Sequence, residues 1–251
     1  RLLSKSWTRP DPSAILAGGA NSSPSRHASK AYGRIGNLEV RLACGRSDVR
    51  LAQRLRYSVF YEEMGAKPTP LAALLRRDED PYDALCDHLL VIDTSIRGEA
   101  RWGADRKSSV VGTYRVLRQE VARRHHGFYT QGEYDIAPLV AGKPGLSFLE
   151  VGRSCVLKPY RTKRTVELLW HGLWTYIREV KADVLIGCAS FPGTDPYAHA
   201  MALSFLHHHA LAPEEWRCRA HDGRRVAMDM LPAAEVDAKA ALKATPPLIK
   251  A

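Results

Sequence analysis

Two charged side chains interrupt an apolar stretch of this sequence. Residues 149–155 read LEVGRSC, which places Glu150 and Arg153 in a segment otherwise suited to a buried strand. A buried carboxylate without a partner is costly, so such a group is either paired or used in chemistry. In a regular strand the two side chains would face opposite sides of the sheet. A bulge at Gly152 would bring them to one side and open a slot beside the strand, and a structural ion pair is the alternative.

A basic loop follows this stretch. The sequence KPYRTKRT at residues 158–165 holds Arg161, Lys163 and Arg164 directly before an expected long helix. The first turn of a helix presents unpaired N–H groups and a partial positive charge, and both favour a bound phosphate. A solvated basic loop capped by Thr165 is the alternative. Because the loop joins a strand to the following helix of an α/β sheet, we favour a phosphate site.

Acidic residues gather in a turn before another expected strand, within RRDEDPYDALCDHLL at residues 76–90. They are Asp78, Glu79, Asp80, Asp83 and Asp87. Their spacing does not follow a calcium-binding loop. In a strongly basic protein such a cluster could bind a cationic amine, and helix caps with solvated acids are the alternative.

Elsewhere, Arg56 and Phe60 lie one turn apart on an expected helix, and Arg115 interrupts an expected strand as Glu150 does.

Widely shared catalytic motifs are absent from the sequence, which contains no G-x-S-x-G, G-x-x-x-x-G-K-[ST], H-E-x-x-H or G-x-G-x-x-G. The usual grounds for a hydrolase, a nucleoside triphosphatase or a dehydrogenase are therefore missing. Histidines 207–209 end an expected helix, where three successive side chains point in three directions and cannot converge on one metal ion. We expect no metal site.

The elements that must position these residues alternate between strand and helix. Strand patterns cover residues 39–45, 86–93, 108–119, 146–157, 182–191 and 224–231, and helix patterns cover residues 48–65, 164–180, 196–209 and 235–244. The strongest helix has an apolar stripe made of Val166, Leu169, Trp170, Leu173, Trp174, Ile177 and Val180. The continuous apolar run after it is typical of a strand buried on both faces. The order predicts a layered α/β domain.

Composition limits the other possibilities. The 251 residues include 45% hydrophobic residues and carry a net charge of +10, so the chain folds and its surface attracts anionic partners. No segment reaches the roughly 18 apolar residues that a membrane-spanning helix needs. The five cysteines contain no C-x-x-C pair, and we expect them to be reduced in a cytoplasmic protein. Residues 1–34 are rich in Ser, Gly, Ala and Pro and are expected to be disordered, whereas residues 35–251 form a single domain.

Several long motifs, in one order, resemble the L-ornithine N-alpha-acyltransferases that begin ornithine lipid synthesis in bacteria. The resemblance covers most of residues 35–231 and extends more distantly to the acyl-homoserine lactone synthases and the GNAT superfamily. The motifs are LRYSVFYEEMGA, DPYDALCDHLLVID, VVGTYRVL, GFYTQGEYDIAPL, LEVGRSCVLKPYRTKRTVELLWHGLW and GCASFPGTDPYAHAMALSFLHHH. The resemblance implies a GNAT-like fold, with a mixed, mostly antiparallel sheet that is splayed at one strand and has helices on both faces.

The resemblance also implies an activity and the residues that carry it. The reaction would move a 3-hydroxyacyl group from acyl carrier protein to the alpha-amine of ornithine. The pattern shared with the lactone synthases assigns catalysis to Glu150, Arg153 and Arg115. The substrate-binding positions would be Arg56, Phe60, Asp80, Asp83 and Asp87. The loop with Arg161, Lys163, Arg164 and Thr165 lacks the glycines that hold coenzyme A in GNAT proteins, which fits the single phosphate of a phosphopantetheine arm.

These expectations lead to a mechanism and a set of partners. We hypothesise that Glu150 takes a proton from the substrate ammonium, directly or through a water molecule. No cofactor is expected to be bound, because the acyl donor arrives on the 4'-phosphopantetheine of acyl carrier protein. The positive charge would steer that acidic protein and would suit peripheral contact with the anionic inner membrane. Relatives continue past residue 250, so we expect this chain to be truncated at its C-terminus.

Two alternatives remain open. The first keeps the chemistry and changes the amine acceptor, as in the acyl-homoserine lactone synthases. The second is a non-enzymatic basic module that binds a membrane or nucleic acid. We expect no nucleic-acid partner, because the sequence has no recognised nucleic-acid motif.

Overall fold

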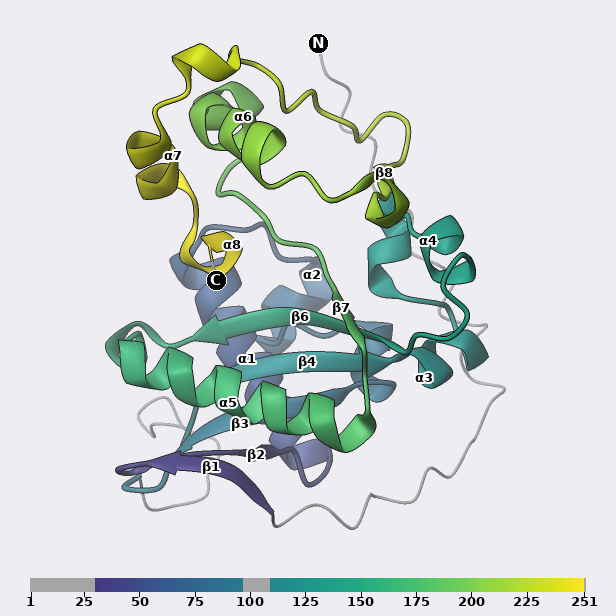
Figure 1. Ribbon diagram of the computed structural model, residues 1–251. Helices are drawn as coiled ribbons and strands as arrows, with labels where there is room; N and C mark the ends of the chain where they lie inside the picture. The colour runs from purple at the N-terminus through teal and green to yellow at the C-terminus, as the bar shows by residue number, and fades with distance from the viewer. Residues whose placement is uncertain (1–29, 97–108, 251) are drawn as a thin grey trace.

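A six-stranded sheet forms the centre of the structure, a computed structural model that describes residues 30–96 and 109–250 (Figure 1). The strand order is β1-β2-β3-β4-β6-β7; all neighbours are antiparallel except β6 and β7, which are parallel. A separate pair joins β5 and β8. The strands are β1 (Ala31–Ile35), β2 (Leu38–Leu42), β3 (Asp87–Asp93), β4 (Val110–Arg118), β5 (Tyr134–Asp135), β6 (Phe148–Val156), β7 (Val184–Ile186) and β8 (Arg219–Ala220).

Helices cover both faces of the sheet, as the GNAT-like fold implies (Figure 1). The α-helices are α1 (Arg46–Tyr57), α2 (Pro70–Leu75), α3 (Gln119–Arg124), α4 (Ala137–Ala141), α5 (Lys163–Val180), α6 (Ala200–His209), α7 (Ala238–Ala244) and α8 (Pro247–Lys250). A π-helix, η2 (Ser58–Glu63), continues α1, and short 3₁₀-helices include η3 (Pro81–Ala84), η4 (Tyr129–Gly132) and η5 (Lys158–Tyr160). Within the described residues, no helix has the length and apolar character needed to span a bilayer.

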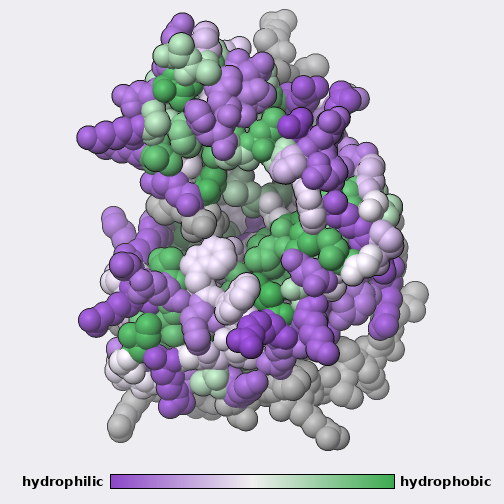
Figure 2. All heavy atoms as spheres, viewed as in Figure 1, coloured by the Kyte–Doolittle hydropathy of each residue, from purple (hydrophilic) through white to green (hydrophobic). Residues whose placement is uncertain are grey.

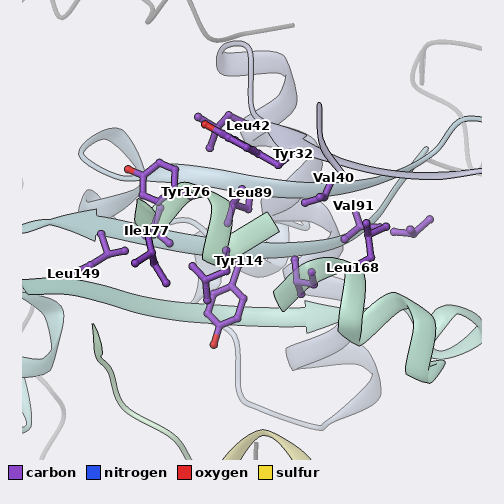
Figure 3. Packing of buried hydrophobic residues seen from close by; sticks show 14 residues of the cluster. Tyr32, Val40, Leu42, Leu89, Val91, Tyr114, Leu149, Leu168, Tyr176 and Ile177 are labelled. Atoms are coloured by element: carbon purple, nitrogen blue, oxygen red, sulfur yellow. The ribbon is translucent and has the colours of Figure 1, made fainter. Parts of the chain in front are cut away.

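The larger core lies between α5 and one face of the sheet. Leu168, Leu173 and Ile177 of α5 pack against side chains of β2, β3 and β4 (Figure 3). The buried stripe is centred on Gly172, where an added Cβ would lie 2.7 Å from a methyl carbon of Val40. The helix therefore lies close to β2.

The predicted stripe of α5 is wrong at two positions. Val166 is 46% exposed and Trp174 is 60% exposed. The buried positions include Thr165, Gly172 and Tyr176 in their place. The prediction counted large apolar side chains at helical spacing, whereas the close approach of the helix to the sheet requires a small residue at Gly172.

The opposite face of the sheet packs against α1. Ala52, Leu55 and Val59 form a second core with Leu90 of β3 and Cys155 of β6. The predicted helix from residue 48 therefore forms, although its last turns are π-helical. Together the two cores confirm a layered α/β domain with helices on both faces.

The strands β6 and β7 pair only over their first residues. Their pairing runs from Phe148 with Val184 to Glu150 with Ile186, and β6 then continues to Val156 without β7. The sheet is therefore splayed at one strand, as the GNAT-like fold implies. The prediction that β7 is buried on both faces is wrong, because β7 is a three-residue edge strand and Leu185 is 39% exposed.

The structure differs from two further predictions, one near the N-terminus and one after α6. Strand β1 begins at Ala31, inside the range 1–34 that was expected to be disordered, because its residues pair with β2. The rest of that expectation, residues 1–29, lies outside the described residues. Residues 224–231 do not form the predicted strand; instead Ser204 of α6 contacts the backbone of Met228 and Leu231 there.

Candidate active site

A pocket opens on the α1 face of the sheet, where β6 leaves β7. Both Glu150 and Arg153 line it, so the two side chains share one side of the strand. Figure 2 shows that the molecule is hollowed between the sheet and the segments around α6 and β8. The residues around the pocket are Cys86, Arg115, Leu117, Tyr129, Glu133, Glu150, Val151, Gly152, Arg153, Cys188 and Ser190.

A bulge in β6 produces this arrangement. Thr113 of β4 pairs with Cys155, whereas Arg115 pairs with Gly152, so β6 carries one extra residue between these pairs. The bulge lies one residue later than predicted, since Arg153 and not Gly152 has a positive φ of 52°. Holding a non-glycine residue there costs about 1–3 kcal/mol. The surrounding contacts of Arg153 must therefore outweigh that strain.

The Glu150 carboxylate is held by three donors from η4. Its Oε2 accepts from the backbone N–H of Tyr129 at 2.8 Å. Its Oε1 accepts from the backbone N–H and from the hydroxyl of Thr130, each at 2.6 Å. A carboxylate has about four acceptor positions, so one remains for a group in the pocket. Glu150 is only 6% exposed, and its orientation is fixed by the turn rather than by Arg153.

Arg153 pairs with aspartates and not with Glu150. Its Nε lies 3.5 Å from Asp78 Oδ2 and its Nη2 lies 3.4 Å from Asp80 Oδ2. Its guanidinium also lies 5.4 Å from the centre of the Tyr129 ring. Charge-assisted hydrogen bonds are usually near 2.7–2.9 Å, so these ion pairs are long. With 30% of its side chain exposed, Arg153 is the most exposed of the arginines that contact these aspartates, and it can meet a ligand in the pocket.

Three arginines neutralise Asp78, Asp80 and Asp83 of the acidic cluster. Arg56 contacts Asp78 at 2.8 Å and Asp83 at 2.6 Å. Arg115 contacts Asp80 at 2.6 Å and Asp83 at 2.9 Å. With Arg153, the three aspartates and three arginines form one network across α1, β4, β6 and the turn before β3. The group of aspartates that was expected to bind a cationic amine therefore has no excess of negative charge.

The network perturbs the acidity of its buried members. Burial alone would raise the pKa of Asp83, but the charge and hydrogen bond of Arg56 and the charge of Arg115 hold that pKa well below its ordinary value. Burial alone would lower the pKa of Arg115, but the charges of Asp80 and Asp83 and the hydrogen bond to Asp80 contribute to raising it above its ordinary value. Arg56 is fully buried. Its place in the structure is inside the network and away from the pocket, so contact with a substrate would require it to move.

Two expected substrate-binding residues lie elsewhere. Asp87 faces α5, where its carboxylate accepts a hydrogen bond from the Tyr176 hydroxyl at 2.6 Å and lies 3.6 Å from Arg118 Nε. Phe60 packs against the α1 core beside Cys155. Neither lines the pocket, so the structure does not bring them together with Glu150.

The basic loop precedes α5 as predicted, but its contacts differ. The Thr162 hydroxyl, and not that of Thr165, caps the helix by accepting from the Thr165 N–H at 3.3 Å. Thr165 is fully buried, so its side chain cannot reach a phosphate in this arrangement. Arg161 donates to both carboxylate oxygens of Glu63. Lys163 and Arg164 are exposed cations of the loop; the side chain of Lys163 is 90% exposed and its Nζ lies 3.6 Å from Glu167 Oε1.

Sequence reasoning missed several residues of the site. Thr130, Tyr129 and Glu133 come from a polar segment that has no hydrophobic period, and Cys188 follows β7. Cys188 donates to the Thr130 hydroxyl at 3.7 Å, and burial raises the pKa of its thiol to about 11. Burial also raises the pKa of Cys86 to about 12. Both thiols therefore remain protonated near neutral pH and are poor nucleophiles.

Metal ligands do not gather in the part of the chain that the structure describes. Histidines 207–209 end α6, and His208 Nε2 contacts the carbonyl of Leu231 at 3.0 Å. The tract therefore supports the local packing of the C-terminal segments.

Comparisons with known proteins identify the family of this chain. Residues 55–171 match the acetyltransferase (GNAT) domain family. The L-ornithine N(alpha)-acyltransferase of Agrobacterium fabrum is 52% identical over 219 residues, which are 87% of this chain and 73% of that protein. The protein of the same name from Rhizobium meliloti is 51% identical over 89% of this chain and 73% of its own length. Among solved structures, FeeM, an N-acyl amino acid synthase from uncultured soil microbes, is 16% identical with a TM-score of 0.42 over 66% of this chain and 77% of that one. On the strength of the two long alignments, this chain belongs to the L-ornithine N(alpha)-acyltransferase family.

Proposed function

We propose that this protein transfers a 3-hydroxyacyl group from acyl carrier protein to the alpha-amine of L-ornithine. The observation that carries the proposal is the pocket at the splay of β6 and β7, which Glu150 and Arg153 line together. The amine and the reaction are those named for relatives that are about half identical to this chain. The product would be an N-acyl amino acid, the first intermediate of an ornithine lipid.

Glu150 is the proposed base. It takes one proton from the substrate alpha-ammonium, directly or through a water molecule, using the acceptor position that η4 leaves free. The neutral amine then attacks the thioester carbonyl and forms the C–N bond. The C–S bond breaks as the tetrahedral intermediate collapses, and the phosphopantetheine thiolate leaves and takes up a proton.

Arg153 is proposed to hold the alpha-carboxylate, because its guanidinium is partly exposed and its ion pairs are long. Arg115 is buried at the pocket wall and holds Asp80 in place.

The splay supplies groups for the transition state. Beyond Glu150, the edge of β6 that faced β7 has no strand partner. Backbone N–H groups on such an edge can donate to the oxygen that becomes negative as the amine attacks. A closed sheet would use the same groups in its own ladder.

The chemistry favours the alpha-amine over the side-chain amine. An alpha-amino group has a pKa of about 8 and a lysine-type amine a pKa of about 10.4. Removing a proton from the alpha-ammonium therefore costs less by roughly 3 kcal/mol. A base of carboxylate strength benefits from that difference, provided that the distal ammonium is held away from Glu150.

The donor side of the proposal uses the basic loop. We assign the phosphate of the phosphopantetheine arm to Lys163 and Arg164, which are exposed beside the N-terminus of α5. The net charge of +10 suits an acidic carrier protein. The same charge and a lipid product support a place in the cytoplasm at the surface of the anionic inner membrane.

A direct assay tests the function. The purified protein is incubated with 3-hydroxyacyl carrier protein and a panel of amino acids, and free thiol and product mass are measured. We expect thiol release and an N-acyl product with ornithine above all other amines. A product with another amine, or no thiol release with any, would contradict the proposal.

The role of Glu150 has its own test. Glu150→Gln keeps the size of the side chain and removes the base, so we expect turnover to fall by about 100-fold or more. Circular dichroism and thermal unfolding report whether the turn around Thr130 survives the change. Turnover close to that of the wild type would exclude Glu150 as the base.

A further inference from the structure

Two carboxylates line the pocket, and only that of Glu150 is held by the hydrogen bonds from η4 that the structure describes. Glu133 is half-buried and lines the pocket with Glu150, Arg153 and Cys188. Within residues 30–96 and 109–250, neither an ion pair nor a side-chain hydrogen bond engages its carboxylate. This separates Glu133 from Asp78, Asp80 and Asp83, each of which contacts arginine.

The backbone holds Glu133 in place. Its N–H donates to the carbonyl of Thr130 at 3.0 Å, and its carbonyl accepts from the N–H of His221 at 3.0 Å. The next residue, Tyr134, begins β5 and pairs with Ala220 of β8. Glu133 thus belongs to the same turn that positions the Glu150 carboxylate through Thr130. Its distance from the proposed base is set by a short, hydrogen-bonded stretch of chain.

The charge of Glu133 acts on the pocket. Burial raises the pKa of Tyr129, and the negative charge of Glu133 adds to that rise against the opposing charge of Arg153. Burial is the largest cause of the raised pKa of the Cys188 thiol, and the negative charge of Glu133 adds to that rise. Tyr129 and Cys188 both line the pocket, so the field of Glu133 extends into the space where a substrate would lie.

We propose that Glu133 binds the side-chain ammonium of a diamino acid acceptor and thereby determines the choice of substrate. The inference rests on the proposed function, and it moves the cation site from the acidic cluster to this residue. Arg153 would hold the alpha-carboxylate, and Glu133, which lines the same pocket, would hold the distal ammonium. An extended diamino acid held at both ends presents its alpha-amine to Glu150 and keeps its second amine away from the base.

A competition between two acceptors tests the assignment. L-ornithine is compared with L-2-aminopentanoate, which has the same carbon chain without the terminal ammonium. In the wild type we expect kcat/KM to favour ornithine. In Glu133→Gln we expect that preference to fall by about 10- to 100-fold, the size of one charge-assisted hydrogen bond. The loss should appear in KM for ornithine, while kcat/KM for 2-aminopentanoate stays the same.

Two further variants serve as controls. Glu133→Asp keeps the charge and should retain part of the preference. Asp135→Asn removes an exposed carboxylate two residues away that does not line the pocket, and it should leave the preference unchanged. An equal effect of Asp135→Asn would show that net charge, and not this site, is responsible.

The outcomes distinguish a failure of the Glu133 assignment from a failure of the proposed function. A wild-type protein that prefers ornithine, together with a Glu133→Gln variant that keeps the same preference, would overturn the assignment of Glu133 alone. A wild-type protein that acylates neither amino acid would overturn the proposed function and this inference with it.

Discussion

Asp83 is the most heavily contacted carboxylate of the buried network. It accepts from Arg56, Arg115 and the side-chain amide of Gln53, which donates at 2.9 Å. It also accepts from the N–H of Asp80, which makes it part of the cap of η3. Such a group stabilises the fold chiefly because removing its charge leaves the two arginines buried without compensation.

Asp83→Asn should therefore lower the free energy of unfolding by about 3–5 kcal/mol. Chemical denaturation measures the loss, and Glu79→Gln is the matched control. The side chain of Glu79 is 51% exposed and its ion pair with Arg77 lies at the surface, so its removal should cost at most about 1 kcal/mol. Equal effects of the two changes would show that the network contributes no more than a surface ion pair.

Acid should act through the same residue. The pKa of Asp83 is lowered from 3.8, so between its folded and unfolded pKa values the unfolded chain binds more protons. Stability from Asp83 is therefore present above about pH 4 and is lost as pH falls through the folded pKa. Asp83→Asn should flatten the dependence of stability on pH in that window.

The members of the site could be identified from the sequence only where they looked out of place. Glu150 and Arg115 interrupt apolar strands, and both line the pocket. The pairing of the aspartates with arginines could not be predicted, because Arg56, Arg115 and Arg153 come from three elements that only the fold brings together. Glu133 and Thr130 lie in a polar segment without periodicity, where nothing distinguishes them from residues of an ordinary loop.

At the scale of elements, the divergence of β6 and β7 depends on Gly187. A Cβ added at Gly187 would lie 2.3 Å from the carbonyl oxygen of Val151, and a backbone atom cannot move aside as a flexible side chain can. Gly187 directly follows the last paired residue of β7. The small residue therefore lets the two strands stay together up to the point where the pocket begins.

Gly187→Ala should push β7 away from β6 and lower stability by about 1–3 kcal/mol, the usual cost of overpacking. Because the pocket lies at this point, kcat/KM for the acyl donor should fall as well. Gly145→Ala is the control, since an added Cβ there meets nothing within 4 Å. Thermal unfolding measures the change in stability, and thiol release measures kcat/KM. If Gly187→Ala changes neither, the separation of β6 and β7 does not depend on Gly187.

Long apolar segments could be assigned from the sequence more reliably than their ends. β3, β4, β6 and α5 form where the pattern predicts them, because many residues contribute to each. The bulge was displaced by one residue, since either Gly152 or its neighbour could adopt the required geometry. β7 is shorter than its apolar run, because partners on β6 end at Glu150 and apolar residues alone do not make a ladder.

At the scale of the whole molecule, the net charge of +10 is the feature that a protein partner would meet first. Exposed cations lie along α5 and the loop before it, including Lys163, Arg164 and Arg178. Arg161 contributes less, because Glu63 neutralises it. Charge of one sign on one element raises the association rate of an oppositely charged partner, and this gain falls as salt screens the field.

Arg164→Glu should lower kcat/KM for acyl carrier protein by about tenfold while leaving kcat unchanged, because it slows docking and not chemistry. Raising the ionic strength should reduce wild-type kcat/KM in the same way, and the variant should respond less. Arg123→Glu on α3, which lies at the other end of the sheet (Figure 1), changes the net charge equally and should have a smaller effect. The same measurements with an acyl-coenzyme A of equal chain length identify the donor. If acyl-coenzyme A is the better substrate, acyl carrier protein is not the preferred donor. An equal effect of Arg164→Glu on both donors would show that Arg164 acts only on the phosphopantetheine phosphate that they share and not in docking the surface of a carrier protein.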